Sequence, residues 1–335
     1  MSDNDSILPC VVIGAGMSGL VAATPLQEQG IPVVVLDKGR GVGGRMATRR
    51  IADAVFDHGA QFFTVRDPRF AELVSRWQSQ GVVSEWARGF ANVEGVYRGD
   101  GHLRYRGSTG MTAAPKCLAQ ALDVRVRTRV AEIRAEAGTW SIRTDDGQHL
   151  RCQQLVMTPP VPQSLALLGA DRSPIPAEAR HALASITYDP CIALMALLDK
   201  PSRIPEPGGM QIDHGPITWI ADNTLKGISP DAHSVTIHTD PQFSRQHWQT
   251  DDDQIVRLLM DAAQEWIGTD IRTYQIHRWL FSKPTTLYPE ACLYVPTPSP
   301  IVFAGDAFAG PRVEGAAISG LAAAEKLLSA STDRP

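Results

Sequence analysis

The residues best suited to chemistry near the start of the chain form a glycine-rich turn. Residues 14–19 read Gly-Ala-Gly-Met-Ser-Gly and follow an apolar run that ends at Ile13. In such a turn Gly14 permits a tight bend, Gly16 lets the backbone approach a pyrophosphate, and Gly19 lets the following helix pack closely on the strand. The phosphates of a dinucleotide would then lie over free N–H groups at the positive end of that helix. The pattern predicts a dinucleotide site.

A carboxylate stands at the matching distance along the chain. The apolar run at residues 33–36 ends at Asp37, and positions 19 and 37 are 18 residues apart. That separation is close to the ~20 residues expected for an acid that hydrogen-bonds an adenosine ribose. A second glycine-rich loop, residues 39–44, ends at Arg45. Its guanidinium could pair with a phosphate through two hydrogen bonds, which a simple nicotinamide dehydrogenase does not require.

These pieces together resemble the signature of the FAD-containing amine oxidase superfamily, in which Gly-Gly-Arg follows the ribose-binding acid. Most members have glutamate where this chain has Asp37, and aspartate is shorter by one methylene but keeps both acceptor oxygens. The resemblance implies a noncovalently bound FAD. It also implies an α/β fold, with a Rossmann-like FAD-binding domain of the amine oxidase/p-hydroxybenzoate hydroxylase type and a second substrate domain (α+β) with a mixed sheet.

The C-terminal part of the chain resembles the second flavin signature of the same superfamily. An apolar run at residues 301–304 is followed by Gly305, Asp306 and a loop of small residues, and then by a helical pattern. The resemblance implies that Asp306 accepts hydrogen bonds from the ribityl chain. We expect the N-terminus of the helix, near residues 316–319, to face the flavin edge on which reduction places negative charge.

Further pieces resemble the bacterial members of the renalase family within this superfamily, over essentially the whole chain. The most specific pieces are residues 59–62, Gly-Ala-Gln-Phe, and residues 278–279, Arg-Trp. Other matching pieces are residues 14–19, 43–46, 107–111, 235–239 and 305–306. The resemblance implies oxidation of dihydronicotinamide dinucleotides that carry the hydride at ring C2 or C6 instead of C4. Flavin N5 would take the hydride and pass it to O2 as H2O2, restoring NAD(P)+, which is metabolite repair.

Such a reaction requires no catalytic acid or base from the protein. Loss of hydride leaves an aromatic cation, so stacking, shape and a few carboxamide contacts suffice. The sequence has no Ser-His-Asp order and no metal-ligand spacing. We therefore predict no catalytic residue and no metal ligand.

The predicted site residues fall into two groups. The predicted cofactor-binding residues are Gly14, Ala15, Gly16, Ser18, Gly19, Asp37, Lys38, Gly44, Arg45, Gln61, Phe62, Val130, Asp306 and Ile318. The predicted substrate residues are Phe63, Tyr97, His238, Arg278 and Trp279. Within the first group, Gln61 and Phe62 are expected to border the isoalloxazine, and Val130 is expected to contact adenine through its backbone.

Composition and cysteine spacing argue against several other classes of protein. A net charge of −4 gives no electrostatic case for nucleic acid or an anionic membrane. The five cysteines are scattered and never spaced Cys-x-x-Cys, which favours a reducing, cytoplasmic compartment over disulfides or zinc. No signal peptide is apparent, and the longest apolar stretch, residues 192–198, is far below the ~20 residues that span a bilayer. The expected partners are the dinucleotide substrate and O2, and the sequence leaves the oligomeric state open.

Hydrophobic periodicity and chain length predict the organisation. Helices are expected at about residues 17–29, within 65–77 and at 253–267, with Pro25 kinking the first. A small antiparallel meander is expected from residues 124–127, 129–134, 140–144 and 150–151. With 335 residues the chain can form two lobes. We predict a discontinuous FAD-binding domain from residues 1–64, 107–160 and 285–335, and a substrate domain from residues 65–106 and 161–284.

Two other functions are compatible with the sequence. A monoamine or polyamine oxidase would use an aromatic cage and a carboxylate to bind a cationic amine. Six aromatic residues could supply the cage: Trp86, Tyr97, Tyr188, Trp219, Trp248 and Trp279. A non-catalytic binding protein with a nucleotide fold would purify colourless, and the intact Gly44-Arg45 and Gly305-Asp306 pairs argue against it. The preferred dihydro isomer and the choice between NAD and NADP stay open.

Overall fold

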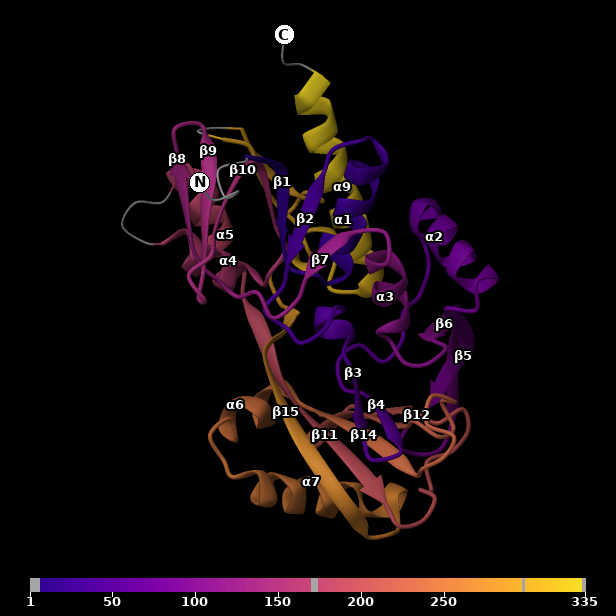
Figure 1. Cartoon of the computed structure of the whole chain (residues 1–335). Coiled ribbons are helices and arrows are strands. Elements are labelled where there is room, and N and C mark those ends of the chain that lie inside the picture. The colour runs from indigo at the N-terminus through magenta and orange to yellow at the C-terminus, as the bar shows by residue number, and fades with distance from the viewer. Residues whose placement is uncertain (1–6, 170–173, 297–298, 333–335) are drawn as a thin grey trace. The chain divides into compact units, whose positions relative to one another are not determined.

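The computed structural model describes residues 7–169, 174–296 and 299–332. The chain folds into two compact units, and each is interrupted in sequence (Figure 1). Unit 1 comprises residues 1–44, 115–187 and 284–335, and unit 2 comprises residues 45–114 and 188–283.

Unit 1 is built on a sheet whose central strands are parallel. The strand order is β16 (Leu293–Val295), β17 (Ile301–Phe303), β10 (His149–Met157), β1 (Leu8–Ile13), β2 (Val33–Leu36) and β7 (Asp123–Arg125). All neighbours pair in parallel except β16 and β17. β8 (Val130–Glu136) and β9 (Thr139–Thr144) extend β10 as an antiparallel meander. Parallel strands buried on both faces read as continuous apolar runs, and Val33–Leu36 is such a run, fully buried.

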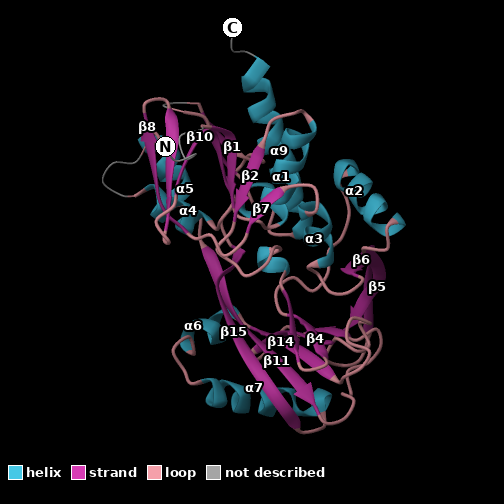
Figure 2. Cartoon of the chain, in the orientation of Figure 1, coloured by secondary structure: helices cyan, strands magenta, loops and turns pink. Residues whose placement is uncertain are grey.

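Two long helices pack together beside this sheet. α1 (Met17–Glu28) and α9 (Val313–Thr332) lie side by side, as Figure 2 shows. A Cβ on Gly320 of α9 would lie 2.3 Å from the carbonyl oxygen of Ser18 on α1. Only glycine allows so close an approach, which joins the N-terminal and C-terminal segments of unit 1. The shorter helices of unit 1 are α4 (Val161–Leu168), α5 (Ala177–Ala184) and α8 (Asp306–Ala309).

α1 has nearly the predicted length. It ends at Glu28, and Gly30 follows in a left-handed conformation with φ of 77°. Pro25 lies inside the helix, which nevertheless continues without a break from Met17 to Glu28. The predicted helices in unit 2 are α2 (Pro68–Ser79) and α7 (Asp252–Ile267).

Unit 2 is built on a seven-stranded sheet. The strand order is β15 (Ile271–Pro284), β11 (Tyr188–Leu198), β14 (Ser234–Thr239), β13 (Ile217–Asp222), β12 (Gly209–Gln211), β5 (Val83–Ala91) and β6 (Tyr97–Gly107). A separate hairpin contains β3 (Thr48–Ile51) and β4 (Ala54–Asp57). α6 (Pro241–Gln246) precedes α7, and the 3-10 turn η1 (Gly44–Met46) and α3 (Ala113–Ala119) lie where the units meet in sequence.

The two faces of this sheet differ in character. Ile220, Val235 and Ile237 point to one face, where they form a core with Ile255 and Leu259 of α7. Successive residues of a strand point to opposite faces. The other face therefore carries the alternate residues of β13 and β14, which are Trp219, Ala221, Thr236 and His238. One face of the sheet is apolar and covered by α7, and the other face carries aromatic and polar side chains.

Several sequence predictions about single strands are wrong. Residues 124–127 do not join the meander, because β7 pairs in parallel with β2 at the edge of the main sheet. The piece at 150–151 is part of a longer strand, β10, which continues to Met157 and pairs in parallel with β1. The 14-residue strand β15 has no counterpart among the predicted elements. Its residues are half-buried with irregular alternation, which is a weak period-two signal.

The unit boundaries also differ from the predicted domains. Residues 45–64 and 107–114 lie in unit 2, because Asp57 pairs there with Lys226 and the carbonyl of His58 accepts a hydrogen bond from Trp279. Residues 161–187 lie in unit 1, where α4 packs against β8. The assignment of FAD and substrate to particular domains stays a prediction.

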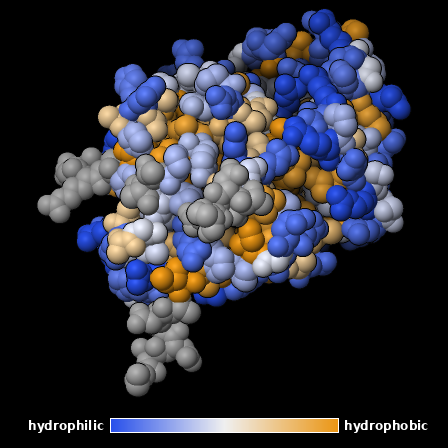
Figure 3. Space-filling view, turned by 90° about the horizontal axis from the view of Figure 1, so that it is seen from above, coloured by the Kyte–Doolittle hydropathy of each residue, from blue (hydrophilic) through white to orange (hydrophobic). Residues whose placement is uncertain are grey.

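No helix in the described ranges combines the length and apolarity of a membrane span. On the face seen in Figure 3, apolar residues appear in separate groups among polar ones. Large apolar side chains with more than half of their surface exposed are Val96, Tyr97 and Leu280.

Candidate functional site

The first candidate site is the turn between β1 and α1. Gly14 has φ of 103°, a region that favours glycine, and a Cβ there would lie 2.5 Å from Oγ1 of Thr158. Thr158 follows β10 and donates its hydroxyl to the carbonyl oxygens of Ile13 and Gly14, at 2.8 and 3.2 Å. The turn is thus fixed from the neighbouring strand.

The other two glycines have contrasting surroundings. Gly16 is the N-cap of α1, where no side chain caps the helix, and a Cβ on it would meet nothing within 4 Å. A Cβ on Gly19 would lie 2.0 Å from the carbonyl oxygen of Gly14. Oγ of Ser18 is buried and has no hydrogen-bond partner within the described part of the chain. Open space above uncapped amides, beside an unpaired hydroxyl, fits the pyrophosphate of a dinucleotide.

Asp37 joins the two glycine-rich loops of unit 1. Its carboxylate oxygens accept hydrogen bonds from the backbone N–H of Ala15 and of Gly39, both at 2.6 Å. The N–H of Gly43 in turn donates to the carbonyl of Ala15 at 2.8 Å. A carboxylate has about four acceptor positions. Two of them are used here, so the predicted ribose contact by Asp37 remains chemically available.

The C-terminal signature begins as expected but its helix starts earlier. Gly305 follows β17, and its N–H donates to Oγ of Ser319 on α9 at 2.8 Å. α9 begins at Val313, and the N–H of Ala316 already donates to the carbonyl of Arg312. The unbonded amides of a helix lie in its first turn. The prediction that residues 316–319 form the helix N-terminus is therefore wrong by about one turn.

The contrast between Gly16 and Gly19 gives a direct test of this turn. Gly19→Ala is expected to destabilise the protein by about 1–3 kcal/mol, because its Cβ collides with backbone at Gly14. Gly16→Ala should leave stability within about 0.5 kcal/mol, yet reduce flavin content, because its methyl fills the open space above the helix. Urea unfolding and the ratio of flavin to protein absorbance measure the two effects. Equal flavin content in Gly16→Ala and wild type would refute a phosphate site at this turn.

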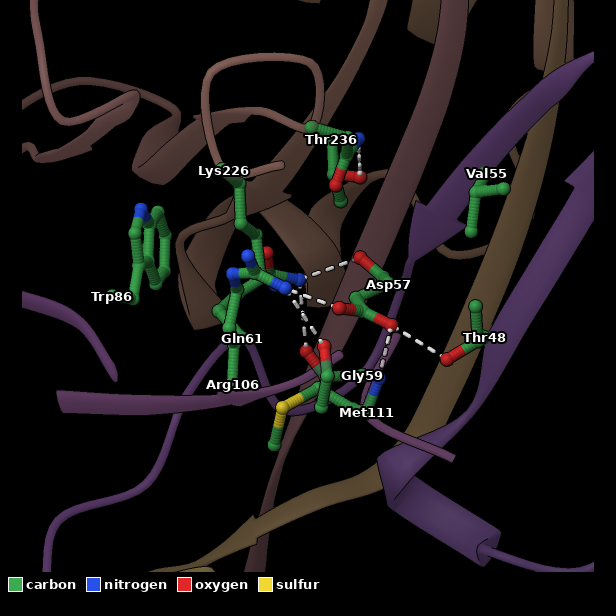
Figure 4. A network of polar contacts seen from close by, with 12 residues as sticks. Thr48, Val55, Asp57, Gly59, Gln61, Trp86, Arg106, Met111, Lys226 and Thr236 are labelled. Carbon is green, nitrogen blue, oxygen red and sulfur yellow. Dashed lines mark hydrogen bonds and ion pairs between the residues drawn. The ribbon is translucent and has the colours of Figure 1, made fainter. Parts of the chain in front are cut away.

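The second candidate site lies in unit 2 around a fully buried ion pair. Nζ of Lys226 lies 2.7 Å from Oδ2 of Asp57, and both side chains have no solvent exposure. Oδ1 of Asp57 accepts hydrogen bonds from the hydroxyl of Thr48 at 2.6 Å and the N–H of Met111 at 2.8 Å. Burial lowers the pKa of Lys226, and the adjacent carboxylate of Asp57 opposes that shift. Figure 4 shows these contacts converging on Asp57.

The same residues fix the side chain of Gln61. Its Nε2 donates to the carbonyl oxygens of Asp57 at 2.6 Å and Gly59 at 3.1 Å. Carbonyl oxygens only accept, so the amide nitrogen is assigned by its partners. Oε1 of Gln61 is then left buried without a partner among the described residues. Gly59 permits this turn, because a Cβ on it would lie 2.0 Å from the carbonyl oxygen of Arg45.

Four aromatic rings form a cluster next to this network. Phe62, Trp86, Phe90 and Trp219 contact one another with ring centroids 4.8–6.2 Å apart. We call these four residues the aromatic cluster. Two cations of the protein itself lie over its rings: Nζ of Lys226 is 4.9 Å from Trp86, and the guanidinium of Arg104 is 5.6 Å from Phe90. The cluster thus already contains the charge that a cage would bind.

Three histidines and Trp279 lie close by in unit 2. His58 stacks on Trp279 with centroids 5.3 Å apart and meets His277 edge-on at 4.8 Å. Burial, with the neighbouring His277, Arg49 and His238, lowers the pKa of His58 to about 3. Burial also lowers the pKa of His238 to about 4 and that of His277 to about 4. All three imidazoles are therefore neutral at neutral pH.

The structure separates Arg278 from Trp279, although the sequence predicts that both face the substrate. Nε1 of Trp279 donates to the carbonyl of His58 at 2.7 Å. Arg278 instead donates to the carbonyls of Trp248 and Thr250 and pairs with Asp252 at the start of α7. Adjacent residues of a strand point to opposite faces, so the two cannot share one. The structure therefore does not bring Arg278 and Trp279 together on one face, and the substrate role of each stays a prediction.

Other predicted residues occupy varied positions. Phe63 is buried against Tyr105 and Phe70, and Tyr97 lies exposed on the edge strand β6. Arg45 donates to the carbonyl of Ser282 at 3.2 Å, and Lys38 donates to Gln163 at 3.0 Å. Val130, the first residue of β8, is buried, and Ile318 of α9 is half-buried. These positions are consistent with core or supporting roles as well as with the predicted ones.

The sequence missed three residues that organise the sites, namely Thr158, Asp57 and Lys226. Asp57 and Lys226 are 169 positions apart, and no local motif marks the lysine. Thr158 directly follows the parallel strand β10, and the carboxyl ends of such strands are where α/β proteins place functional groups, so its position was an available signal. Asp57 ends β4 of an antiparallel hairpin, and that position carries no such signal.

The aromatic residues proposed for an amine cage do not come together as one group. Trp86 and Trp219 belong to the aromatic cluster, and Tyr188 contacts Phe281. Trp248 packs on the α7 side of the sheet, and Trp279 stacks on His58. No group of three or more metal-ligating side chains with suitable geometry occurs in the described ranges.

Comparison with known proteins agrees with this architecture. Residues 86–328 match the family model for flavin containing amine oxidoreductases, and residues 12–77 match an NAD(P)-binding Rossmann-like domain. The chain is 24% identical to renalase of Mus musculus over 292 residues, 82% of this chain and 85% of that protein. It is 46% identical over 54 residues to a possible lysine-specific histone demethylase 1 of Drosophila melanogaster, which is 16% of this chain and 6% of that protein.

Solved structures with the same fold cover nearly the whole chain. A putative protoporphyrinogen oxidase from Exiguobacterium sp. 255-15 superposes with a TM-score of 0.74 at 14% identity, covering 98% of this chain and 99% of that one. Wild-type putrescine oxidase bound to putrescine gives 0.71 at 14% identity, covering 97% and 99%. At these identities the likeness concerns fold alone, and the predicted fold class is confirmed. Since its family model spans most of the sequence, the chain belongs to the flavin-containing amine oxidoreductases and is a flavin-dependent oxidoreductase.

Proposed function

We propose that the protein is a renalase-type oxidase with noncovalent FAD, which oxidises the 1,2- and 1,6-dihydro isomers of NAD(P)H. The substrate loses a hydride to become NAD(P)+, and O2 takes up the two electrons and two protons to become H2O2. The likeness to mouse renalase over most of both chains supports this choice within the family. The observation that carries it is the aromatic cluster of unit 2, whose own cations occupy its ring faces.

A cationic amine would bind poorly beside these side chains. Nζ of Lys226 already lies over Trp86, and the charge of Asp57 is already paired with it. A second ammonium would need its own carboxylate to offset desolvation and repulsion. A dihydronicotinamide ring is planar and neutral, so it can stack on aromatic rings without that cost.

The residues present also suit a reaction without proton abstraction from the substrate. His58, His238 and His277 are uncharged at neutral pH because burial lowers the pKa of each imidazole. These neutral side chains can pack against a bound ring and form hydrogen bonds with it, but they add no charge. Departure of hydride from a dihydropyridine ring yields an aromatic product, so the protein must only bind and orient the ring.

The turn between β1 and α1 fits the FAD that the proposal requires. Open space at Gly16, the uncapped start of α1 and the unpaired hydroxyl of Ser18 would hold its pyrophosphate, and Asp37 would hold its ribose. When bound, the flavin supplies the two-electron acceptor and the reaction with O2.

Anaerobic single-turnover reduction tests the proposal. The purified holoenzyme would be mixed with each isomer separated from borohydride-reduced NAD+ and NADP+, with 1,4-dihydro-NADH, and with amines including putrescine. We expect rapid bleaching of flavin absorbance by a 1,2- or 1,6-dihydro isomer, release of NAD(P)+, and H2O2 on admitting air. Bleaching by an amine alone would favour an amine oxidase, and a colourless protein that binds no FAD would favour a non-catalytic binding protein.

A further inference from the structure

Five buried side-chain polar atoms of unit 2 lack hydrogen-bond partners within the described part of the chain: Nδ1 of His58, Oε1 of Gln61, Nε of Arg104, Nε1 of Trp219 and Oδ1 of Asn223. Two of them belong to neutral side chains close to His238, namely Oε1 of Gln61 and Nε1 of Trp219, which are 6% and 8% exposed. The first can only accept a hydrogen bond, and the second can only donate one. A buried polar group without a partner reduces stability. An unpaired acceptor and an unpaired donor together indicate a ligand that offers one of each.

Both side chains are neighbours of His238. Nε2 of Gln61 lies 3.4 Å from Nε2 of His238. Trp219 on β13 stands directly opposite His238 on β14 in the antiparallel pairing. Residues directly opposite each other share a face, with Cβ atoms about 4.5–5.5 Å apart. Phe62, which follows Gln61 in sequence, also packs on the ring of Trp219. The acceptor and the donor therefore belong to one locality, on the sheet face opposite α7.

The acceptor is held in place by the buried ion pair. Both hydrogens of the Gln61 amide are directed at the carbonyls of Asp57 and Gly59, so Oε1 must point the other way. Asp57 is itself immobilised by Lys226, Thr48 and the N–H of Met111 (Figure 4). A rigid acceptor loses little entropy when it binds a ligand, which makes it a good determinant of specificity.

Resting on the proposed function, we propose that Gln61 and Trp219 bind the carboxamide of the dihydronicotinamide ring and determine specificity for it. Oε1 of Gln61 accepts from the carboxamide NH2, and Nε1 of Trp219 donates to the carboxamide oxygen. A primary amide is the neutral group that pairs with both. A methyl ketone in its place lacks the N–H, and a carboxylate would place a negative charge against Oε1.

Ligand binding to the holoenzyme tests this assignment without turnover. Dissociation constants would be measured anaerobically by calorimetry for the 1,4-dihydro forms of NAD+ and of its 3-acetylpyridine analogue, whose rings are neutral like that of the proposed substrate. We expect wild type to prefer the carboxamide over the ketone by about tenfold, the worth of one hydrogen bond. Gln61→Met should abolish that preference. Trp219→Phe should weaken carboxamide and ketone alike by about tenfold. Equal affinity of wild type for the two, or no binding of either, overturns the assignment.

Trp86→Phe is the matched control, because it makes the same change in the same aromatic cluster. Nε1 of Trp86 already donates to the carbonyl of Pro207 at 2.8 Å. Its loss should lower the melting temperature and leave the ligand preference at the wild-type value. Trp219→Phe removes an unpaired donor, so its melting temperature should stay at or above wild type. A shift of preference in Trp86→Phe equal to that in Gln61→Met would contradict the proposal.

Flavin content separates this inference from the alternatives. The sequence predicts that Gln61 borders the isoalloxazine, whereas this proposal assigns its Oε1 to the substrate. On the proposal, Gln61→Met and Trp219→Phe should both retain flavin at the wild-type ratio to protein. Loss of flavin in both would mean that the two atoms bind the cofactor, which overturns the substrate assignment. If wild type binds carboxamides selectively but oxidises no dihydro isomer, the proposed function fails while this inference survives. If the isomers are oxidised and the variants keep the wild-type preference, only this inference fails.

Discussion

Lys226→Met is expected to lower the free energy of unfolding by about 3–5 kcal/mol. The substitution leaves the carboxylate of Asp57 fully buried without its counter-ion, and water cannot reach it. The hydrogen bonds from Thr48 and Met111 remain, but they do not neutralise the charge. The aromatic face of Trp86 also loses the cation above it. This is the largest effect that we expect from a single side chain in the structure.

Urea unfolding of the variant followed by circular dichroism measures this effect. Arg125→Met is the matched control, because Arg125 and Asp123 are 2.8 Å apart but both substantially exposed, and exposed pairs contribute about 0–1 kcal/mol. The double variant Asp57→Asn, Lys226→Met should recover part of the loss, because neither charge is then left unpaired. A Lys226→Met variant as stable as Arg125→Met would show that the buried pair does not hold the fold.

Stability is expected to decrease as the pH falls below about 6.5, by about 2 kcal/mol at pH 5 from His58 alone. Burial and its neighbours lower the pKa of His58 from 6.5 to about 3. As the pH falls through 6.5, the unfolded chain takes up a proton that the folded protein does not, so unfolding is favoured. The stability is fully present above the unfolded pKa and is lost progressively down to about pH 3. Lowered pKa values of His238 and His277 act in the same direction.

Chemical denaturation at intervals from pH 7.5 to pH 4.5 measures this dependence. His58→Asn keeps a polar side chain of similar size but has no proton to gain in this range. Its stability should therefore depend less on pH than that of wild type, by about 2 kcal/mol between pH 7 and pH 5. Parallel profiles for wild type and His58→Asn would contradict a neutral, buried His58.

The sequence predicted those features that depend on local backbone chemistry. The turn at residues 14–19 requires glycine for its φ angle at Gly14 and for the close approach at Gly19. It can therefore be predicted from the local sequence alone. The apolar run at residues 33–36 predicts a strand buried on both faces, and the helical spacing of apolar residues at 253–267 predicts a helix with one buried face. Both are observed. These local patterns were enough to predict the fold class, the discontinuous flavin signature and the location of the candidate dinucleotide site.

Pairing between distant segments could not be predicted from the local sequence. β7 pairs in parallel with β2, and this pairing joins segments about 90 residues apart, so no local pattern in residues 123–125 indicates it. The sequence predicts that Arg278 and Trp279 face the substrate together, yet successive residues of β15 point to opposite sides, Arg278 toward Asp252 of α7 and Trp279 toward His58. The two-residue sequence alone does not show that the two faces of its strand contact different parts of the protein.

The sequence by itself determined the glycine-rich turn at residues 14–19 and the family to which this protein belongs, because both depend on residue types at short, fixed spacing. Only the tertiary structure decided that Asp57 meets Lys226, that the rings of the aromatic cluster already hold cations, and that Gln61 and Trp219 keep unpaired polar atoms. The physical reason is burial. A charge or an amide acquires its chemical character from the groups that replace water around it, and those groups come from remote parts of the chain.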